Sequence, residues 1–335
     1  MKLISFRDDD NKRLGLLIGD QVYPVGRLQP GFPETMQELL EGWDRWIERL
    51  WSFEKKLRNH VIPKPSNLAL GDIELCAPVP NPGSCRDGYA FRQHVEAARR
   101  NRGADMTRVF DEFPVFYFTN HRTVQGPGVV HCMPDHLGRL DFELEAAFVI
   151  CREGKNIKAA DADRHIGGLM VMNDLSARDL QMEEMLLNLG PAKGKDFATV
   201  LGPWLVTLDE LQEMACPPKA GHTGLSWKLS MYARVNGVTV SRGNLSDMDW
   251  TFAEIIERAS YGVTLYPGVV IGSGTVGTGC FLELNGTAKM HDSFHVEQWL
   301  KAADHIELEI EGLGILSSTI AMENTRHSLL ELKKS

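Results

Sequence analysis

The sequence predicts a mainly β protein with some α-helix: a large mixed β-sandwich or β-roll that follows a small N-terminal α+β domain. Three observations lead to this fold class. Strand-like runs dominate the chain after residue 83, few helical stretches interrupt them, and a Pro-rich stretch at 62–83 separates them from the N-terminal segment. We therefore expect domains at residues 1–75 and 76–335.

The N-terminal segment is expected to contain a β-hairpin and one helix. The runs "KLISF" and "LGLLIGDQVYPV" flank a polar turn, which is a hairpin signal. Thr35 and Glu38 have capping-box spacing, and apolar residues then recur at steps of three and four. This spacing predicts a buried helical face rather than an aromatic ligand site. The residues concerned are Met36, Leu39, Leu40, Trp43, Ile47, Leu50 and Trp51.

The remaining chain predicts strands with helices near 92–101, 176–188 and 251–260. Asn236-Gly237 lies between two alternating runs and predicts a two-residue hairpin turn. The predicted strands are "LDFELEAAFVI", "GGLMVMND", "GPWLVTL", "WKLSMYARVNGVTVSRG", "PGVVIGSGTVG", "CFLELNG" and "HIELEIEGLGILSSTIA".

Bulk composition excludes several classes of protein. With 36 Lys plus Arg against 45 Asp plus Glu, the net charge of −9 argues against duplex nucleic-acid binding. The 6 cysteines form no C-x-x-C pair, which fits a reducing compartment. The start "MKLISFRDDD" has no apolar signal core, and no stretch reaches the roughly 20 apolar residues of a membrane span. A cytoplasmic protein without nucleic-acid or membrane partners is expected.

An unusual acidic pattern occurs in the run "LDFELEAAFVI" at 140–150. Apolar residues fill all the even positions from 140 to 150, and Asp141, Glu143 and Glu145 fill the first three odd positions. On one strand the two glutamates would be roughly 7 Å apart, at about 3.4 Å per residue. Like charges this close require open water, a protonated carboxyl or a cation between them. The pattern alone leaves these three options open.

Other candidate groups lie at the ends of predicted elements. Asp174 ends the strand "GGLMVMND", and the following Ser176 and Asp179 have capping-box spacing. Asp87 precedes a predicted helix that carries His94; if helical throughout, they would be roughly 10 Å apart. An acid and an imidazole at that separation can bracket a small substrate, although either group can also be purely structural.

The run "VVIGSGTVG" contains a G-x-G-x-x-G pattern at Gly272, Gly274 and Gly277. A dinucleotide site also needs a helix directly after these glycines, to offer its N-terminus to a pyrophosphate. The following "TGCFLELNG" reads as β-structure, so we expect the glycines to form a tight turn beside the substrate.

The motifs "RDGYAFRQH", "LDFELE", "MNDLSARDLQ", "GKDFATVLGPW" and "GSGTVG…FLELNG", in this order, resemble the fumarylacetoacetate hydrolase family over residues 80–325. The resemblance implies the family's β-roll fold, a homodimer and a site with four metal-binding carboxylates. An all-carboxylate set favours a hard divalent cation, Mg²⁺ or Ca²⁺, with Mn²⁺ as a further option. The matching positions are Asp87, Glu143, Glu145 and Asp174.

The resemblance also implies roles for residues around the metal. His94 matches the general base, Glu283 the acid that orients it, and Lys195 a cation that supports developing enolate charge. The alternative for Glu283 is an exposed position on a strand. Residues matching substrate-binding positions are Tyr89, Arg92, Tyr117, Arg178, Gln181 and Thr275.

The chain departs from the smaller decarboxylase and tautomerase members of the family. Thr119 stands where they carry lysine, and Ala97 stands where they carry the Glu of a His-x-x-Glu pair. We therefore expect hydrolysis of a carbon–carbon bond in a β-diketo or acylpyruvate-type acid such as fumarylacetoacetate. The alternatives are decarboxylation, tautomerisation, isomerisation or dehydration of a small 2-oxo acid, or a non-catalytic Ca²⁺ site. Residues 100–140 are expected to contribute loops that line the pocket.

Overall fold

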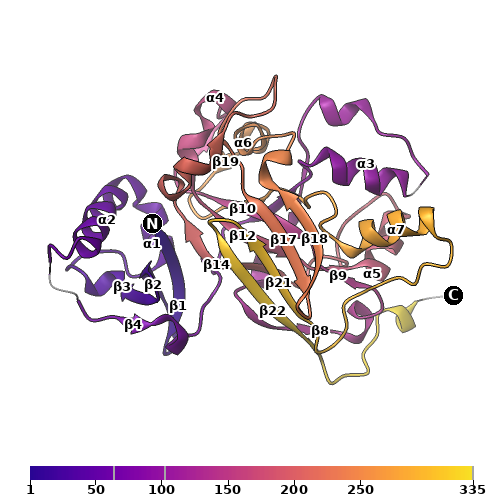
Figure 1. Cartoon of the computed structure of the whole chain (residues 1–335), viewed down its shortest axis with the longest axis horizontal. Coiled ribbons are helices and arrows are strands. Elements are labelled where there is room, and N and C mark those ends of the chain that lie inside the picture. Colours follow the sequence, from indigo (N-terminus) through magenta and orange to yellow (C-terminus); the bar gives the residue numbers. More distant parts are fainter. Residues whose placement is uncertain (63–64, 102, 334–335) are drawn as a thin grey trace.

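The computed structural model describes residues 1–62, 65–101 and 103–333 (Figure 1). Positions 63 and 64 of the predicted boundary and position 102 of the predicted pocket loops lie outside the described residues. The fold is two β-sheets flanked by helices, which confirms the predicted mixed sheet-dominated architecture. None of the helices in the described part of the chain has the length and apolarity that crossing a bilayer requires.

The larger sheet has 11 strands and runs through the middle of the molecule. Its central strands β14 (Thr199–Val206), β12 (Ile166–Asp174) and β10 (Leu144–Ile150) are antiparallel. Strand β20 (Val270–Gly272) lies between β10 and β5 (Cys85–Gly88) and pairs with both. In spatial order the strands are β4 (Leu68–Ala69), β3 (Gln21–Pro24), β2 (Asn11–Ile18), β1 (Lys2–Asp8), β14 (Thr199–Val206), β12 (Ile166–Asp174), β10 (Leu144–Ile150), β20 (Val270–Gly272), β5 (Cys85–Gly88) and β6 (Phe116–Thr119), with β7 (Val124–Gln125) on β14.

A five-stranded sheet packs against one face of the larger sheet (Figure 1). The Asn236-Gly237 turn joins two of its strands with positive φ at both residues, as predicted. The order is β18 (Val238–Asn244), β17 (Ser230–Val235), β21 (His305–Ile310), β22 (Gly314–Met322) and β8 (Gly128–Cys132). Two-stranded pairs complete the β-structure: β9 (Leu140–Asp141) with β13 (Ser176–Ala177), β11 (Gly154–Lys155) with β19 (Thr264–Leu265), and β15 (Ala215–Cys216) with β16 (Ser226–Trp227).

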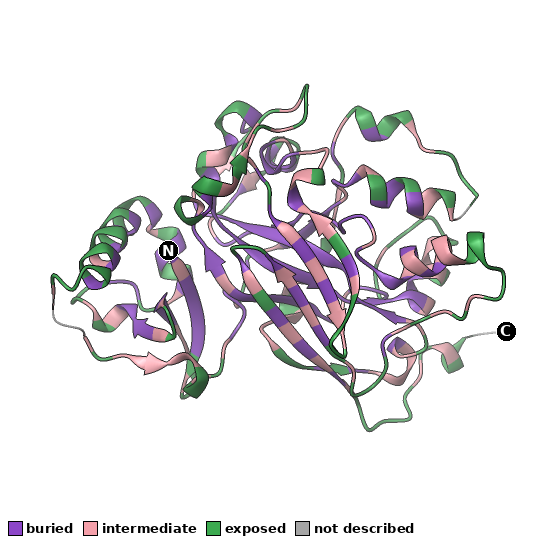
Figure 2. Cartoon of the chain, viewed as in Figure 1, coloured by how far each residue is buried: buried purple, intermediate pink, exposed green. Residues whose placement is uncertain are grey.

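Strands β10 and β12 are buried on both faces (Figure 2). Phe148 and Val171 belong to the core shared with the five-stranded sheet, whereas Ala147 and Met170 belong to the core under the N-terminal helices. The helices are α1 (Met36–Glu41), α2 (Trp43–Arg58), α3 (Arg92–Arg100), α4 (Ala159–Ala162), α5 (Arg178–Met185), α6 (Phe252–Ser260) and α7 (Phe281–His291).

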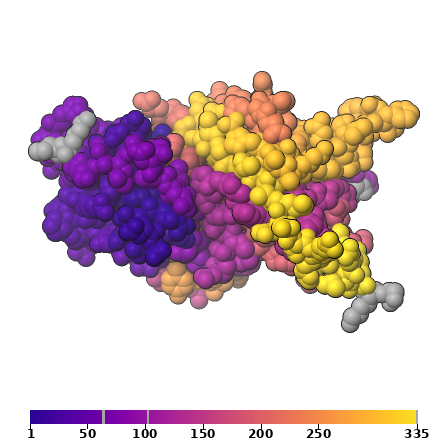
Figure 3. Space-filling model, turned by 90° about the horizontal axis from the view of Figure 1, so that it is seen from below, coloured from indigo at the N-terminus to yellow at the C-terminus, as the bar shows by residue number. Residues whose placement is uncertain are grey.

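The N-terminal residues form one end of the molecule (Figure 3). Their strands extend the larger sheet, because β1 pairs with β14, so the division at residue 75 stays a prediction. Thr35 caps α1 by accepting a hydrogen bond from Glu38 N, as its spacing suggested. The single predicted helix is interrupted at Gly42, and Trp51 was wrongly expected in the core: its side chain is 36% exposed.

Two local predictions were wrong. Residues 280–286 do not form a strand; they begin helix α7, since Asp141 accepts hydrogen bonds from the first N–H groups, Phe281 N at 2.7 Å and Leu282 N at 3.0 Å. A short apolar run cannot reveal this distant partner. Ser176 does not cap α5, which begins at Arg178; its hydroxyl donates to the Asp174 carbonyl instead.

The packing of helix α6 against the larger sheet can be tested at Phe148, which is fully buried against Phe252 with ring centroids 4.9 Å apart. We expect Phe148→Ala to lower the free energy of unfolding by about 3–5 kcal/mol, because it leaves a cavity in this core. Urea denaturation measures the loss. The matched control is Phe294→Ala, since Phe294 is 90% exposed and its removal should change stability by less than about 0.5 kcal/mol.

Candidate active site

A cavity of about 520 Å³ opens where helices α3, α5 and α7 meet strands β5 and β6. It contains most of the residues that the sequence singled out. Those lining it are Asp87, Tyr89, His94, Tyr117, Glu143, Arg178, Gln181, Lys195, Thr275 and Glu283.

Three carboxylates converge at the base of this site. Oxygens of Asp87, Glu143 and Glu145 lie within 4.8 Å of one another, and all three residues are buried. Asp87 comes from β5 and Glu145 from β10, which are both neighbours of β20. Glu143 lies in the two-residue break before β10, where Asn173 Oδ1 accepts a hydrogen bond from its N–H at 3.0 Å. Open water around an exposed acidic strand is thus excluded as the explanation of the pattern.

The fourth predicted carboxylate, Asp174, lies beside this cluster. It ends β12, is fully buried, and shares the Lys195 ammonium with Glu143; the Lys195 Nζ to Asp174 Oδ2 distance is 2.7 Å. Tyr117 donates its hydroxyl hydrogen bond to the same carboxylate. Glu145 and Asp174 do not line the cavity itself and lie behind its wall.

Burial dominates the protonation of these acids. It raises the pKa of Asp87 to about 7, assisted by the negative charge of Asp174, and raises the pKa of Glu145 well above its usual range, assisted by Asp87. Burial also disfavours the charged form of Glu143, but Lys195 and Arg178 outweigh it and lower that pKa to about 2. Without a cation, the cluster therefore keeps protons at neutral pH.

The donor set fits a hard divalent cation. Glu145 Oε2 and Asp174 Oδ1 are buried and accept no hydrogen bond from any described residue, although such atoms are normally satisfied. The oxygens come from carboxylates alone, which Mg²⁺, Ca²⁺ and Mn²⁺ favour. Zn²⁺ would prefer nitrogen or sulfur ligands. Asp87, Glu143 and Glu145 would hold the ion, with Asp174 beside them.

His94 and Glu283 form a buried pair on the cavity wall. Each lies in the first turn of its helix, α3 and α7, and Nδ1 of His94 is 2.7 Å from Oε2 of Glu283. The other Glu283 oxygen accepts a hydrogen bond from Thr278 N at 2.9 Å, and Tyr89 packs edge-on against the imidazole. Glu283 is not an exposed strand residue.

Arg178 has a different environment from the one expected of a substrate-binding arginine. Its guanidinium is 2% exposed and donates hydrogen bonds to Asp141, Glu143 and Gln181 at 2.7–2.9 Å. Asp141, which also caps α7, was not predicted as a site residue. The only signal for it was its place as the first acid of "LDFELE". Arg178 therefore positions Glu143 and Gln181 along the cavity.

Arg92 is not brought to the cavity. Its guanidinium is ion-paired with Asp111, and Nε lies 3.7 Å from Asp249 Oδ1, while the chain stacks on Phe110. This geometry does not favour a role in substrate binding. Thr275 does reach the site, where its hydroxyl donates to Glu145 Oε1 at 3.2 Å.

The apolar part of the cavity wall was not predicted from the sequence. Within the predicted pocket loops, Val115 and Phe116 line it, but the other contributors come from helices and from a segment after α7. Those residues are Ala98, Met182, Met185, Leu282 and Trp299.

The glycine-rich turn serves the carboxylate cluster. Gly274 has φ of +80° and donates its N–H to Asp87 Oδ1 at 3.1 Å, and a side chain at Gly272 would collide with that carboxylate. A helix does follow the glycines, contrary to expectation, but Asp141 already occupies its N-terminal N–H groups. A carboxylate thus already takes the first two of these N–H groups, which disfavours a pyrophosphate at this position.

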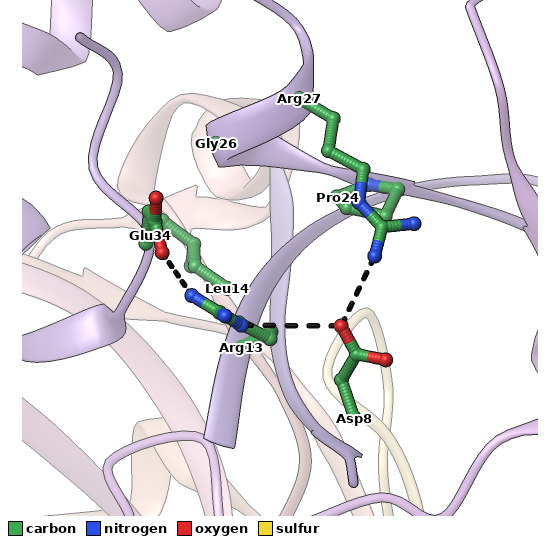
Figure 4. A pocket seen from close by; sticks show the side chains of 7 residues that line it. All are labelled: Asp8, Arg13, Leu14, Pro24, Gly26, Arg27 and Glu34. Atoms are coloured by element: carbon green, nitrogen blue, oxygen red, sulfur yellow. Dashed lines mark hydrogen bonds and ion pairs between the residues drawn. The ribbon is translucent and has the colours of Figure 1, made fainter. Parts of the chain in front are cut away.

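A second, smaller pocket lies in the N-terminal segment, far along the sheet (Figure 4). Its charged side chains satisfy one another: Arg13 pairs with Glu34, and Arg27 Nη2 lies 3.1 Å from Asp8 Oδ2. Such exposed, mutually neutralised pairs are ordinary surface features.

The carboxylate cluster predicts a pH-dependent response to metal. Asp87 has a raised pKa in the folded protein, so the metal-free protein binds more protons than the unfolded chain, and its stability falls as pH rises from about 4 to 7. A cation must displace these protons. At fixed Mn²⁺, the increase in Tm should therefore be larger at about pH 8 than at about pH 5.5, as thermal scans with and without EDTA can show. An increase independent of pH would contradict the assignment.

A protein-family model and several known proteins match this chain. The family model for the fumarylacetoacetate (FAA) hydrolase C-terminal domain matches residues 84–321. Oxaloacetate tautomerase YisK of Bacillus subtilis is 32% identical over 256 residues, covering 75% of this chain and 74% of that protein. Human mitochondrial oxaloacetate tautomerase FAHD2A is 29% identical, covering 96% and 91%.

Further relatives include a hydrolase. Maleylpyruvate hydrolase of Aquipseudomonas alcaligenes is 28% identical, covering 82% of this chain and 90% of that protein. A Mycobacterium smegmatis crystal structure superposes with a TM-score of 0.71 at 27% identity, covering 97% and 100%. A manganese and pyruvate complex of maleylpyruvate hydrolase from Sphingobium sp. SYK-6 has the same fold, with a TM-score of 0.68, 20% identity and coverage of 97% and 100%. The chain belongs to the fumarylacetoacetate hydrolase family.

Proposed function

We propose that this protein is a divalent-metal-dependent enzyme that hydrolyses a carbon–carbon bond in an acylpyruvate-type β-diketo acid. One observation carries the proposal: the same cavity is lined by the carboxylates Asp87 and Glu143 and by the His94–Glu283 pair. A protein with a purely structural Ca²⁺ would need neither a cavity nor a buried imidazole facing it. The enzyme family supports catalysis as well.

The cation would be held by Asp87, Glu143 and Glu145, with Asp174 alongside. Mg²⁺ or Mn²⁺ suits these ligands, Ca²⁺ is the alternative, and the manganese complex of the maleylpyruvate hydrolase supports Mn²⁺. When bound, the ion would draw electron density from the 2-oxo group and lower the energy of the enolate. The remaining steps, proton transfer and orientation of the reactants, are assigned to side chains of the protein.

His94 acts as the base. Glu283 accepts the hydrogen bond of Nδ1 and so leaves Nε2 free to take a proton from water. The resulting hydroxide attacks the 4-carbonyl carbon of the acid. The C3–C4 bond then breaks, its electron pair forms the enolate of pyruvate, and the imidazolium returns its proton to C3. One acylpyruvate and one water thus give one carboxylic acid and pyruvate.

Lys195 and Tyr117 complete the reacting end of the cavity, which is the part next to the carboxylate cluster and His94. The pKa of Lys195 is raised because Asp174 and Glu143 outweigh the cost of its burial, so the ammonium stays charged. It supplies positive charge where the enolate develops. Tyr117 orients Asp174 through its hydroxyl.

A second candidate is keto–enol tautomerisation of an oxaloacetate-like acid. The relatives favour it, because YisK and human FAHD2A are both named oxaloacetate tautomerases. In this reaction His94 would move a proton between C3 and the oxygen of the enol, and no water would be consumed. Decarboxylation, isomerisation or dehydration through the same enolate are further variants.

Product analysis separates these reactions. With Mg²⁺ or Mn²⁺ present, we expect acetylpyruvate to yield pyruvate and acetate in equal amounts, with pyruvate measured by coupling to lactate dehydrogenase. A tautomerase would consume enol-oxaloacetate without releasing pyruvate, and a decarboxylase would release pyruvate together with CO₂. Failure to convert any of these acids by the metal-loaded protein would reject the proposal. A homodimer in the cytoplasm remains a prediction for sedimentation and localisation experiments.

A further inference from the structure

The cavity is larger than the reacting part of its substrate requires. At about 30 Å³ for each water-sized group, an acid of about nine heavy atoms such as oxaloacetate would fill about 270 Å³. The cavity volume is about 520 Å³. About half of the space therefore lies beyond the reacting end, and its lining determines what the rest of the substrate can be.

Helices α3, α5 and α7, which lie on the same side of the molecule (Figure 1), all contribute residues to the cavity lining. Each places its reactive or anchoring residue in the first turn: His94 on α3, Arg178 on α5 and Glu283 on α7. Residues four and seven positions later on one helix face lie about 6 and about 10 Å further along. On α5 the cavity lining changes from polar to apolar over these steps.

The outer lining positions are apolar on α5, whereas those of α3 and α7 are mixed, with Ala98 and Gly286 beside the polar residues Asn101, Asn285 and Lys289. On α5, Met182 and Met185 follow Arg178 by four and seven residues, on α3 Ala98 follows His94 by four, and on α7 Gly286 follows Glu283 by three. Methionine side chains adapt to apolar groups of varied shape. Further apolar lining is provided by Val115, Phe116, Pro191, Leu282 and Trp299.

Basic side chains in this part of the lining already have carboxylate partners. Arg139 Nε lies 2.5 Å from Asp179 Oδ1, and Lys289 is paired with Glu297. Trp299 Nε1 also donates to Glu297, at 2.9 Å. A second carboxylate on the substrate would therefore meet cations whose charge is already partly neutralised, and it would gain less than it would from an unpaired cation.

The apolar surface continues outside the cavity. Leu186, Leu187 and Leu189 follow α5 directly and are 82%, 81% and 78% exposed. They lead to Gly190 and Pro191, which line the cavity. Consecutive exposed leucines are unusual on a protein surface and typically mark a binding region.

We infer that the protein takes 2-oxo acids whose far end is an extended apolar chain or ring, and discriminates against those that end in a second carboxylate. In acylpyruvates this group is the acyl substituent on C4. The inference rests on the proposed function for the orientation of the acid at the reacting end. Its specificity-determining residues are Met182 and Met185.

Binding of 2-oxo acids that cannot be hydrolysed tests this inference without turnover. We would titrate the Mn²⁺-loaded protein with pyruvate, 2-oxobutanoate, 2-oxohexanoate, 2-oxooctanoate and 2-oxoadipate by calorimetry. Affinity should rise about fourfold per added methylene, which corresponds to about 0.8 kcal/mol. The monocarboxylic 2-oxooctanoate should bind at least about tenfold more tightly than the dicarboxylic 2-oxoadipate. Equal affinities along the series, or tighter binding of 2-oxoadipate, would overturn the inference.

A pair of isosteric variants localises the effect. Met185→Gln should lower the ratio of the affinity for 2-oxooctanoate to the affinity for pyruvate about fivefold or more, because a polar amide then faces the alkyl chain of the ligand. The control is Met290→Gln on α7, since Met290 is 57% exposed and does not line the cavity. An unchanged ratio in Met185→Gln, with Tm preserved, would contradict the assignment.

Measuring kcat/KM for a series of acylpyruvates distinguishes a failure of this inference from a failure of the proposed function. Cleavage of acetylpyruvate without the expected rise in kcat/KM for longer acylpyruvates would refute the apolar specificity and leave hydrolysis intact. Chain-length-dependent binding without cleavage of any acylpyruvate would refute hydrolysis and support the apolar specificity.

Discussion

His94→Gln is expected to lower kcat for the proposed cleavage by about 10²–10⁴-fold while the protein keeps its metal. Among the described residues that line the cavity, His94 is the only histidine, and the Glu283 carboxylate fixes its tautomer. Glutamine retains a hydrogen bond to Glu283 but cannot accept a proton from water. The measurement is kcat, with metal content determined on the same sample.

A matched control is available for this substitution. His222 forms a similar pair with Glu254, with Nδ1 at 3.0 Å from Oε2, outside the cavity. His222→Gln should leave kcat within about twofold, because it changes the same chemistry away from the site. Full activity of His94→Gln with metal retained would reject the role of His94 as the base.

Glu145→Gln is expected to have two opposite effects. Metal affinity should fall by more than about 100-fold, and activity with it, because one charged ligand is lost. The metal-free protein should at the same time become more stable, by roughly 1–3 kcal/mol near pH 8, since a glutamine does not have to hold a proton that the unfolded chain would release. The amide oxygen can still accept the hydrogen bond from Thr275.

Calorimetric Mn²⁺ titration and urea denaturation in EDTA measure the two effects separately. Glu257→Gln provides the control, as Glu257 is exposed on α6 and should change neither quantity. A variant that binds Mn²⁺ as well as the native protein would show that Glu145 is not a ligand. A destabilised metal-free variant would show that its carboxylate is satisfied by the protein alone.

The fold class was predictable because its signals are local. Alternating runs, the Asn236-Gly237 turn and the helix at 251–260 depend on neighbouring residues, and the structure contains all of them. Helix α7 was missed because its start is fixed by Asp141, about 140 residues earlier in the chain. The double burial of β10 was missed for a similar reason, since the N-terminal helices cover its second face.

The candidate site was predictable in its residue types more than in its geometry. The motifs identified Glu143, Asp174 and His94, but the pairing of β10 with β12 and the convergence of three helices come from long-range contacts. Arg92 and Arg178 looked equivalent in the sequence. Only the structure shows that one is ion-paired outside the cavity and the other lies buried in it. Met182 and Met185 carried no motif, because apolar helical residues usually belong to the core.

We propose that one divalent cation binds among the buried carboxylates of Asp87, Glu143 and Glu145 and faces the His94 imidazole across the cavity. Anomalous diffraction from crystals soaked in Mn²⁺ tests it most directly. We expect a single strong anomalous peak within coordination distance of oxygens from Asp87, Glu143 and Glu145. A peak at another place, or none there while the Lys195 ammonium keeps its contacts with Glu143 and Asp174, would contradict it.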